Sequence, residues 1–247
     1  MEYAKLLSHA LTIGENMLCS GAEVSRVEDS IIRICSAYGA DRVDVFTITS
    51  SIVVSVEYGG KTYTQTRRII SYRTDLDMLD RLNSLSRYIC SNVPDEKYLE
   101  KEINSILTKK DYPKYIRLLF WSITAGAFTV FFGGSITDGL VSAFTGALLM
   151  LCVEAVEGLG LNKVFSNMIS SFFVTMLADL AIYMGFGASS DKIIIGNIML
   201  LIPGLAFTNS LRDLIGGDVM SGVLRFCEAC LVAAGIAFGY FLAVVFM

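Results

Sequence analysis

Apolar and polar positions follow different patterns in the two parts of this chain. Up to about residue 112, apolar residues recur at helical or strand spacing among many charged side chains. Beyond that point the apolar stretches approach the roughly 20 mostly apolar residues that a membrane-spanning helix needs. This pattern predicts a membrane protein with an N-terminal α+β domain at residues 1–112 and an α-helical transmembrane domain at residues 113–247.

The first part carries the signals of four helices and three strands. Periodicity predicts helices over residues 2–19, 20–38, 75–92 and 94–110, and strands over residues 42–49, 51–58 and 61–70. Ser20-Gly-Ala-Glu23 has the form of a capping box, so we expect the second helix to begin there. Gly39 is expected to end that helix, and Gly59-Gly60 to form a hairpin turn.

The second part contains five apolar segments that are candidate membrane spans. They cover about residues 116–134, 139–158, 164–184, 192–209 and 221–247. Pro203-Gly204 interrupts the fourth segment, because proline lacks the amide hydrogen that a helix interior requires. Gly235 and Gly239 form a GxxxG pattern in the fifth, which lets the backbone of a neighbouring helix approach closely.

Charge is distributed as unevenly as hydropathy. The chain of 247 residues is 53% hydrophobic with a mean hydropathy of +0.57, and residues 1–117 hold 16 of its 20 basic side chains. Basic residues precede the first predicted span and return in the second and fourth loops as Lys163 and Arg212. The first loop has no basic residue and the third has only Lys192. By the positive-inside rule, we expect the α+β domain in the cytoplasm and the C-terminus outside.

The composition disfavours several classes of function. The chain has no excess of basic residues for nucleic acid and no glycine-rich phosphate loop for an ATP-driven pump. It has one histidine, His9, on which a hydrolytic triad would have to depend. Cys227 and Cys230 have CxxC spacing without a second pair, which is weak support for a metal site. We therefore expect neither an enzyme nor a metal or cofactor site.

Ionisable residues inside the predicted spans need a physical explanation. Each costs a few kcal/mol at membrane depth, so such residues usually face a cavity or a partner. Arg225 and Glu228 are three apart on one helix and can pair. Two interpretations of this pair stay open: mutual neutralisation, or a site for a substrate or a proton. Asp179 has no obvious partner within its own span, which makes it the candidate for a proton relay.

The stretch from Pro203 to Arg225 is unusually polar for a membrane segment. A broken helix presents free backbone groups and helix ends to ions and anionic substrates, although a simple kink is the alternative. The expected substrate-binding or ion-binding residues of this stretch are Pro203, Gly204, Thr208, Asn209 and Arg225. The expected cytoplasmic hinge, which could dock on the N-terminal domain, comprises Arg212, Asp213, Gly217 and Asp218.

A second charged cluster lies in the α+β domain, at Glu23, Arg26 and Glu28. It supports an alternative function, in which the chain is a membrane-anchored sensory or scaffold protein and this domain binds a ligand. Helix capping and surface pairing would also explain the cluster.

Several motifs together resemble one known family of membrane proteins. They are Ser-Gly-Ala-Glu-Val-Ser-Arg-Val-Glu at residues 20–28, Phe-Phe-Gly-Gly-Ser-Ile-Thr-Asp at residues 131–138, and the stretch from Pro203 to Arg225. In this order and spacing the chain resembles the N-terminal-half, larger component of the threonine/serine exporter family.

The resemblance implies a fold, a function and a partner. It implies a cytoplasmic domain followed by membrane helices in the inner membrane of a bacterium. It also implies export of small polar metabolites driven by the proton gradient, either threonine/serine-type amino acids or dicarboxylates such as succinate. The implied partner is a smaller membrane subunit of the same family, and assembly of several copies of this chain also stays open.

Overall fold

The computed structural model describes residues 2–70, 72–109 and 111–246 of the chain. It divides into two compact units. The first comprises Met1–Lys110 together with Leu205–Cys227, and the second comprises Asp111–Gly204 together with Glu228–Met247.

The first unit is built on a three-stranded antiparallel sheet in the order β1-β2-β3. Its strands are β1 (Arg42–Ile48), β2 (Ser51–Tyr58) and β3 (Lys61–Arg68). The predicted hairpin turn is confirmed, since Gly59 and Gly60 both adopt positive φ, at 57° and 74°. In the central strand Ile52, Val54 and Val56 are fully buried and alternate with more exposed residues, so one face of the sheet belongs to the core.

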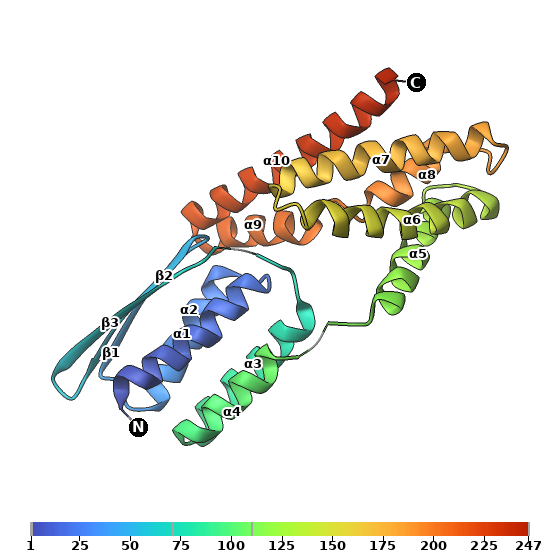
Figure 1. Ribbon diagram of the computed structural model, residues 1–247. Coiled ribbons are helices and arrows are strands. Elements are labelled where there is room, and N and C mark those ends of the chain that lie inside the picture. Colours follow the sequence, from blue (N-terminus) through green and yellow to red (C-terminus); the bar gives the residue numbers. More distant parts are fainter. Residues whose placement is uncertain (1, 71, 110, 247) are drawn as a thin grey trace. The chain divides into compact units, whose positions relative to one another are not determined.

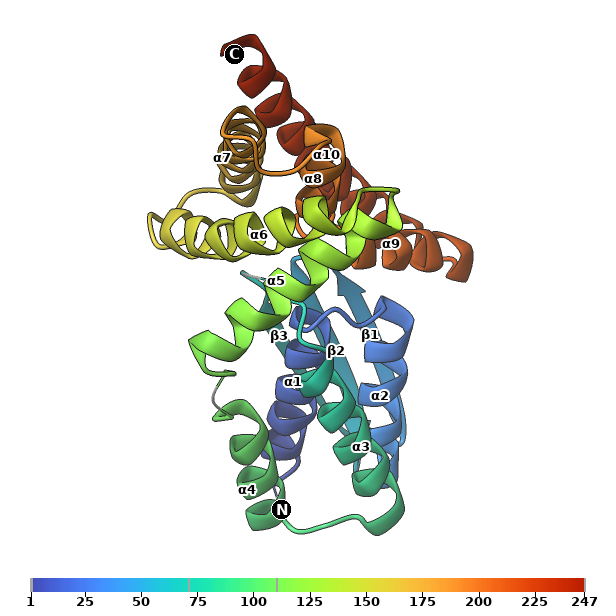
Figure 2. The ribbon, with the colours of Figure 1, turned by 90° about the vertical axis from the view of Figure 1, so that its right-hand side faces the viewer.

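Four helices cover that face of the sheet. Helices α1 (Tyr3–Cys19) and α2 (Val24–Ala37) pack directly on the strands, and α3 (Leu76–Asn92) and α4 (Glu96–Leu107) lie on their outer side (Figure 2). The core between the layers is apolar and fully buried at Leu6, Leu11, Met17, Val27 and Ile31. The predicted α+β fold of this domain is therefore confirmed.

The N-termini of the helices in this unit agree with expectation except at α2. Asp75 and Asp95 cap α3 and α4, accepting hydrogen bonds from the amides of Met78 and Tyr98 at 2.9 and 3.0 Å. The expected capping box at Ser20 does not form. Helix α2 begins only at Val24, and its N-terminal flanking residue, Glu23, makes no capping hydrogen bond with its side chain. The amide of Val24 instead donates a hydrogen bond to the side chain of Asp213.

The second unit is helical. It contains α5 (Lys114–Phe131), α6 (Ile136–Glu157), α7 (Lys163–Tyr183), α8 (Ser190–Ile198) and the C-terminal part of α10 (Val219–Phe246). Within the described residues, α6, α7 and α10 are long and apolar enough to cross a membrane. These helices fit the expected membrane protein, but the expectation of five spans is not confirmed.

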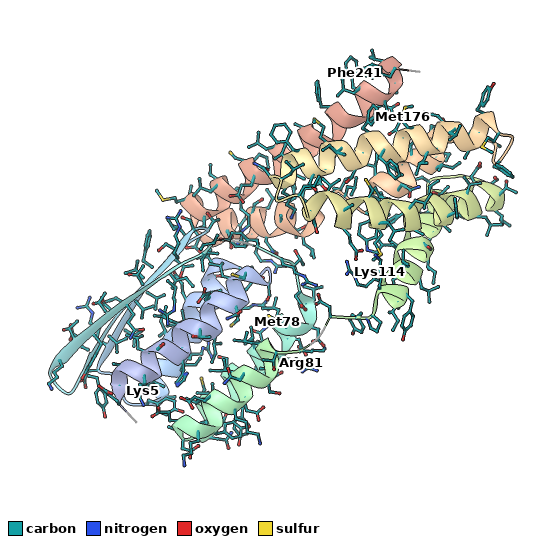
Figure 3. The ribbon with its side chains drawn as sticks, in the orientation of Figure 1. Lys5, Met78, Arg81, Lys114, Met176 and Phe241 are labelled. Atoms are coloured by element: carbon teal, nitrogen blue, oxygen red, sulfur yellow. The ribbon has the colours of Figure 1, made fainter. Side chains whose placement is uncertain are left out.

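Two predicted spans differ from expectation for local reasons. Helix α5 begins with Lys114, labelled in Figure 3, and also contains Arg117. Both side chains pair with Glu154 of α6, at 3.0 and 2.8 Å. The segment predicted over residues 192–209 is divided, because α8 ends at Ile198 and α9 (Gly204–Gly216) begins after Pro203. The predicted break is confirmed, and neither half has the length of a span.

Close backbone approach between α7 and α10 follows the predicted GxxxG pattern. A Cβ atom on Gly235 would lie 2.8 Å from the carbonyl oxygen of Val164, and one on Gly239 would collide with the carbonyl oxygen of Met168. The hydroxyl of Ser171 donates a 2.9 Å hydrogen bond to the carbonyl of Ile236 at the same contact. Small residues therefore fix how these two helices pack.

Candidate functional site

The polar stretch singled out in the sequence docks on the α+β domain. Residues 205–227, here called the α9–α10 hairpin, belong to the first unit. They contact the α1–α2 loop, residues 20–23, which precedes α2 in Figure 1. The docking that the sequence suggested for the hinge residues is thus observed.

Three side chains of the hairpin bind the α1–α2 loop. The amide of Asn209 donates to the carbonyl of Gly21 at 2.7 Å, and Nη1 of Arg225 donates to the carbonyl of Ala22 at 3.1 Å. Arg212 forms an ion pair with Glu23. The loop can present these carbonyls because Gly21 adopts a left-handed conformation, with φ of 102°.

Asp213 supplies the cap that α2 lacks in its own sequence. Its Oδ1 accepts a 3.1 Å hydrogen bond from the amide of Val24, the first residue of α2. The two residues are 189 positions apart in the chain. A carboxylate at a helix N-terminus satisfies a free amide and interacts favourably with the helix dipole. The hairpin and the α+β domain are therefore joined through backbone as well as side chains.

Asp213 and Arg225 form a buried ion pair. Asp213 Oδ2 and Arg225 Nη1 lie 3.3 Å apart, and the two side chains are 0% and 8% exposed. Among the described residues, Asp213 Oδ2 and Arg225 Nη2 have no aligned hydrogen-bond partner. Buried polar atoms are usually satisfied, and in the described part of this unit Thr47 Oγ1 and Gln65 Oε1 also lack a partner. The contact differs from these in that both of its unsatisfied atoms belong to ionisable groups.

The structure gives Arg225 a partner other than Glu228, which disfavours the interpretation in which these two residues neutralise each other. Long side chains on a helix lean toward its N-terminus, so Arg225 reaches back toward the α1–α2 loop and Asp213. Glu228 lies almost one turn further along α10 and is exposed. The charge of Arg225 is therefore balanced by the neighbouring helix, and no ion pair with Glu228 is found among the described residues.

More carboxylates surround the pair. The Oε1 atom of Glu28 accepts a 2.7 Å hydrogen bond from the amide of Thr47, whose carbonyl accepts from the hydroxyl of Ser221 at 3.3 Å. Burial raises the pKa of Glu28 above its usual value, and the nearby charge of Asp218 raises it further. Burial also raises the pKa of Asp213, against the opposing effect of Arg225. Neither carboxylate lies in one of the three candidate spans.

The turn of the hairpin is tightly built. Gly217 has φ of 97°, and the amide of Asp218 donates to the carbonyl of Asp213 at 2.9 Å. A Cβ atom on Gly222 would lie 2.9 Å from the backbone nitrogen of Leu214, so only glycine allows α9 and α10 to approach this closely. Asp213 and Arg225 meet because the turn holds the two helices together.

Other predicted site residues lie outside this cluster. Asp179 is half-buried in α7, and within the described part of the chain the structure gives it no hydrogen bond or ion pair. Pro203 lies at the break before α9, while Gly204 and Thr208 are exposed. In the α+β domain, Arg26 pairs with Glu23 at 3.5 Å.

Sequence reasoning missed a buried polar contact in the second unit. The amide of Asn197, on α8, donates to the hydroxyls of Ser142 and Thr145 on α6, both at 2.9 Å, and is fully buried. Asn197 carries no charge, so the cost of ionisable groups at membrane depth gives no signal for it. An asparagine inside an apolar segment, opposite hydroxyls three apart on another, is the signal that would have found it.

One group of side chains has a geometry that could hold a metal ion. Ligand atoms of His9, Glu96 and Glu100 lie within 4.8 Å of one another among the described residues. The ammonium group of Lys5 lies 2.7 Å from Oε1 of Glu96 and occupies part of this space. A cation would have to displace the lysine, so the arrangement is already balanced as an ion pair.

Comparison with known proteins gives consistent matches over almost the whole chain. Residues 8–247 match the family model ThrE, described as "Putative threonine/serine exporter". The chain is 26% identical over 246 residues to the threonine/serine exporter of Corynebacterium glutamicum, covering 96% of this chain and 50% of that protein. It is 21% identical over 228 residues to the probable succinate transporter subunit YjjP of Klebsiella aerogenes, covering 92% and 88%.

A further relative is also about twice as long as the part that this chain matches. The probable threonine/serine exporter of Mycobacterium tuberculosis is 24% identical over 245 residues, which cover 95% of this chain and 45% of that protein. The chain thus spans about half the length of the two exporters that it matches. No solved structure matches it.

Proposed function

Because this chain belongs to the threonine/serine exporter family, we propose that it is a subunit of a secondary exporter of small polar metabolites driven by the proton gradient. The observation that carries the proposal is the family match over residues 8–247, which includes both the α+β domain and the apolar helices. The absence of a phosphate-binding loop in the sequence favours a gradient over ATP as the energy source.

The proposed substrates share a carboxylate. One relative is named a threonine/serine exporter and another a succinate transporter subunit, so amino acids and dicarboxylates are both proposed. Arg225 is the proposed receptor for the carboxylate, because its Nη2 atom is buried without an aligned partner. Thr208 and Asn209 are proposed as further substrate-binding residues, and the helix break at Pro203-Gly204 as a separate binding position.

We propose a bacterial inner-membrane location, with the N-terminus in the cytoplasm and the C-terminus outside. The contact between the α9–α10 hairpin and the α1–α2 loop supports part of this topology. It requires the fourth predicted loop to lie on the same side as the α+β domain, as the distribution of basic residues also favours.

A smaller membrane subunit of the same family is the proposed partner. The chain spans about half of two exporters, and a relative of similar length is named a subunit. Assembly of several copies of this chain is an alternative that would also enclose a path.

Reconstitution tests the proposed function directly. Full-length chain, with and without the candidate second subunit, is placed in vesicles, and counterflow of labelled threonine, serine and succinate is measured. We expect counterflow of at least one of these compounds only when both subunits are present, and accumulation when a proton gradient is imposed. Absence of flux for all three with both subunits correctly inserted would refute the exporter proposal.

Asp179 is the proposed proton relay within the membrane helices. Its half-buried position in α7, without an ion pair among the described residues, is suited to a carboxyl that alternates between charged and neutral. We expect Asp179→Asn to reduce proton-driven accumulation more than tenfold while counterflow, which needs no net proton movement, is retained. Accumulation at the wild-type rate would remove Asp179 from the proposal.

The alternative of a ligand-sensing or scaffold protein is less well supported. It placed the ligand site at Glu23, Arg26 and Glu28, but these side chains already have partners. Glu23 pairs with Arg26 and Arg212, and Glu28 accepts from the backbone of Thr47. The cluster attaches the α9–α10 hairpin to the α+β domain. This favours a structural role for the cluster in an exporter.

A further inference from the structure

The contact between the hairpin and the α1–α2 loop carries an excess of negative charge. Four carboxylates lie in or beside it, on Glu23, Glu28, Asp213 and Asp218. Three guanidinium groups accompany them, on Arg26, Arg212 and Arg225. Within this set of described side chains, the carboxylates outnumber the guanidinium groups by one.

The carboxylates differ in their ion-pair partners and in how deeply they are buried. Arg26 and Arg212 both pair with Glu23, and their side chains are 47% and 56% exposed. Arg225 is the cation within ion-pair distance of Asp213 in the described part of the chain, and it shares Nη1 with the carbonyl of Ala22. Asp218 and Glu23 add negative charge close to Asp213. Of the four carboxylates, Asp213 is buried most completely, with 0% of its side chain exposed.

We propose that Asp213 binds a proton when the α9–α10 hairpin docks on the α1–α2 loop and releases it when the hairpin detaches. This inference rests on the proposed function, in which such proton binding would couple the gradient to a movement of the hairpin. One proton passes from water to Oδ2 on docking and returns to water on release. This proton site is distinct from Asp179, because Asp213 lies at the contact with the α+β domain.

The geometry suits a neutral carboxyl group. Oδ1 can keep its hydrogen bond from the amide of Val24 after protonation, because that oxygen remains an acceptor. Oδ2 is buried and has no aligned hydrogen-bond donor, so a proton there displaces no existing hydrogen bond.

The direction of the pH dependence follows from burial. Burial raises the pKa of Asp213 more than Arg225 lowers it, and Asp218 and Glu23 act in the same direction as burial. A group with a raised pKa in the docked state binds protons more tightly there than when released into water. Docking is therefore favoured at low pH and weakens as the pH rises from the ordinary pKa of an aspartate through the raised value.

Two measurements on the full-length chain in lipid nanodiscs test the proposal. Infrared difference spectra, recorded from the ordinary pKa of an aspartate upward to alkaline pH, report the carbonyl stretch of a protonated carboxyl. Hydrogen exchange of residues 20–28, corrected for the intrinsic pH dependence of exchange, reports docking. We expect a carboxyl band that disappears as the pH rises, and loss of amide protection with the same midpoint. In Asp213→Asn, the part of the band that comes from Asp213 and the pH dependence of protection should both be absent, while the contribution of Glu28, whose pKa burial also raises, remains.

Asp218→Asn is the matched control. It removes a negative charge that raises the pKa of Asp213 but leaves the pair with Arg225 in place. Both transitions should persist with their midpoint moved to lower pH. The proposal is overturned if Asp213→Asn keeps the wild-type band, or if protection in the wild type does not change with pH. Neither readout involves transport, so its failure is distinct from a failure of the exporter proposal.

Discussion

Replacing Arg225 with methionine is expected to destabilise the first unit by about 3–5 kcal/mol, the usual cost of removing one partner of a buried ion pair. The substitution leaves the carbonyl of Ala22 without its donor. Above the pKa of Asp213, where its carboxylate is charged, it also leaves that carboxylate without its counter-charge. Methionine has a similar length, so loss of packing contributes little. Equilibrium unfolding of the full-length protein in mixed micelles, followed through the α+β domain, measures the change in free energy of unfolding.

Arg212→Met is the matched control for this prediction. Arg212 also pairs with a carboxylate of the α1–α2 loop, Glu23, but its side chain is 56% exposed. Exposed ion pairs contribute about 0–1 kcal/mol because water and salt screen them. Equal losses for Arg212→Met and Arg225→Met would contradict the assignment of the buried pair as the main attachment.

A double substitution separates pairing from other effects. Asp213→Asn removes the negative charge but keeps an acceptor for the amide of Val24. We expect the combined Asp213→Asn and Arg225→Met variant to be more stable than the sum of the single effects predicts, by about 0.5–3 kcal/mol, as for other residues in contact. Additive losses would show that the two side chains do not interact.

Local sequence patterns predicted most of the α+β domain because its elements are specified locally. Alternation in β2 identifies the buried face, and Gly59-Gly60 identifies the hairpin turn. Pro203 likewise identifies a break between two helices, since it lacks the amide hydrogen of a helix interior and α9 begins directly after it. Where the deciding interaction lies within a few residues, the sequence is sufficient.

Interactions between distant segments explain the errors at the candidate site. Helical spacing pairs Arg225 with Glu228, but the actual partner, Asp213, lies on the preceding helix. The cap of α2 also comes from Asp213, so the expected local cap at Ser20 is unnecessary. The sequence identified these residues as candidates from their charge in an apolar setting. It could not show which of them meet, because no periodicity links positions 189 residues apart.

The second unit offers the other large expected effect, at Gly196 of α8. A Cβ atom there would lie 2.8 Å from the backbone nitrogen of Thr129 and 2.9 Å from the carbonyl oxygen of Ala125, both in α5. Backbone atoms within a helix cannot move aside as a flexible side chain can. We therefore expect Gly196→Ala to force α8 away from α5 and to cost about 3 kcal/mol or more, at the upper end for overpacked sites.

Gly216→Ala is the control, since an added Cβ at Gly216 meets nothing within 4 Å. Alanine in place of a helical glycine should be neutral or stabilise by about 0.5–1 kcal/mol. Combining Gly196→Ala with Thr129→Ala distinguishes a side-chain clash from a backbone clash. The second substitution removes the hydroxyl of Thr129 but leaves the Ala125 carbonyl in place, so we expect little rescue of the melting temperature. Full rescue would mean that the hydroxyl alone requires glycine at this position. Without rescue, the backbones of α5 and α8 set their separation, and with it the hydrogen bonds of Asn197 to α6.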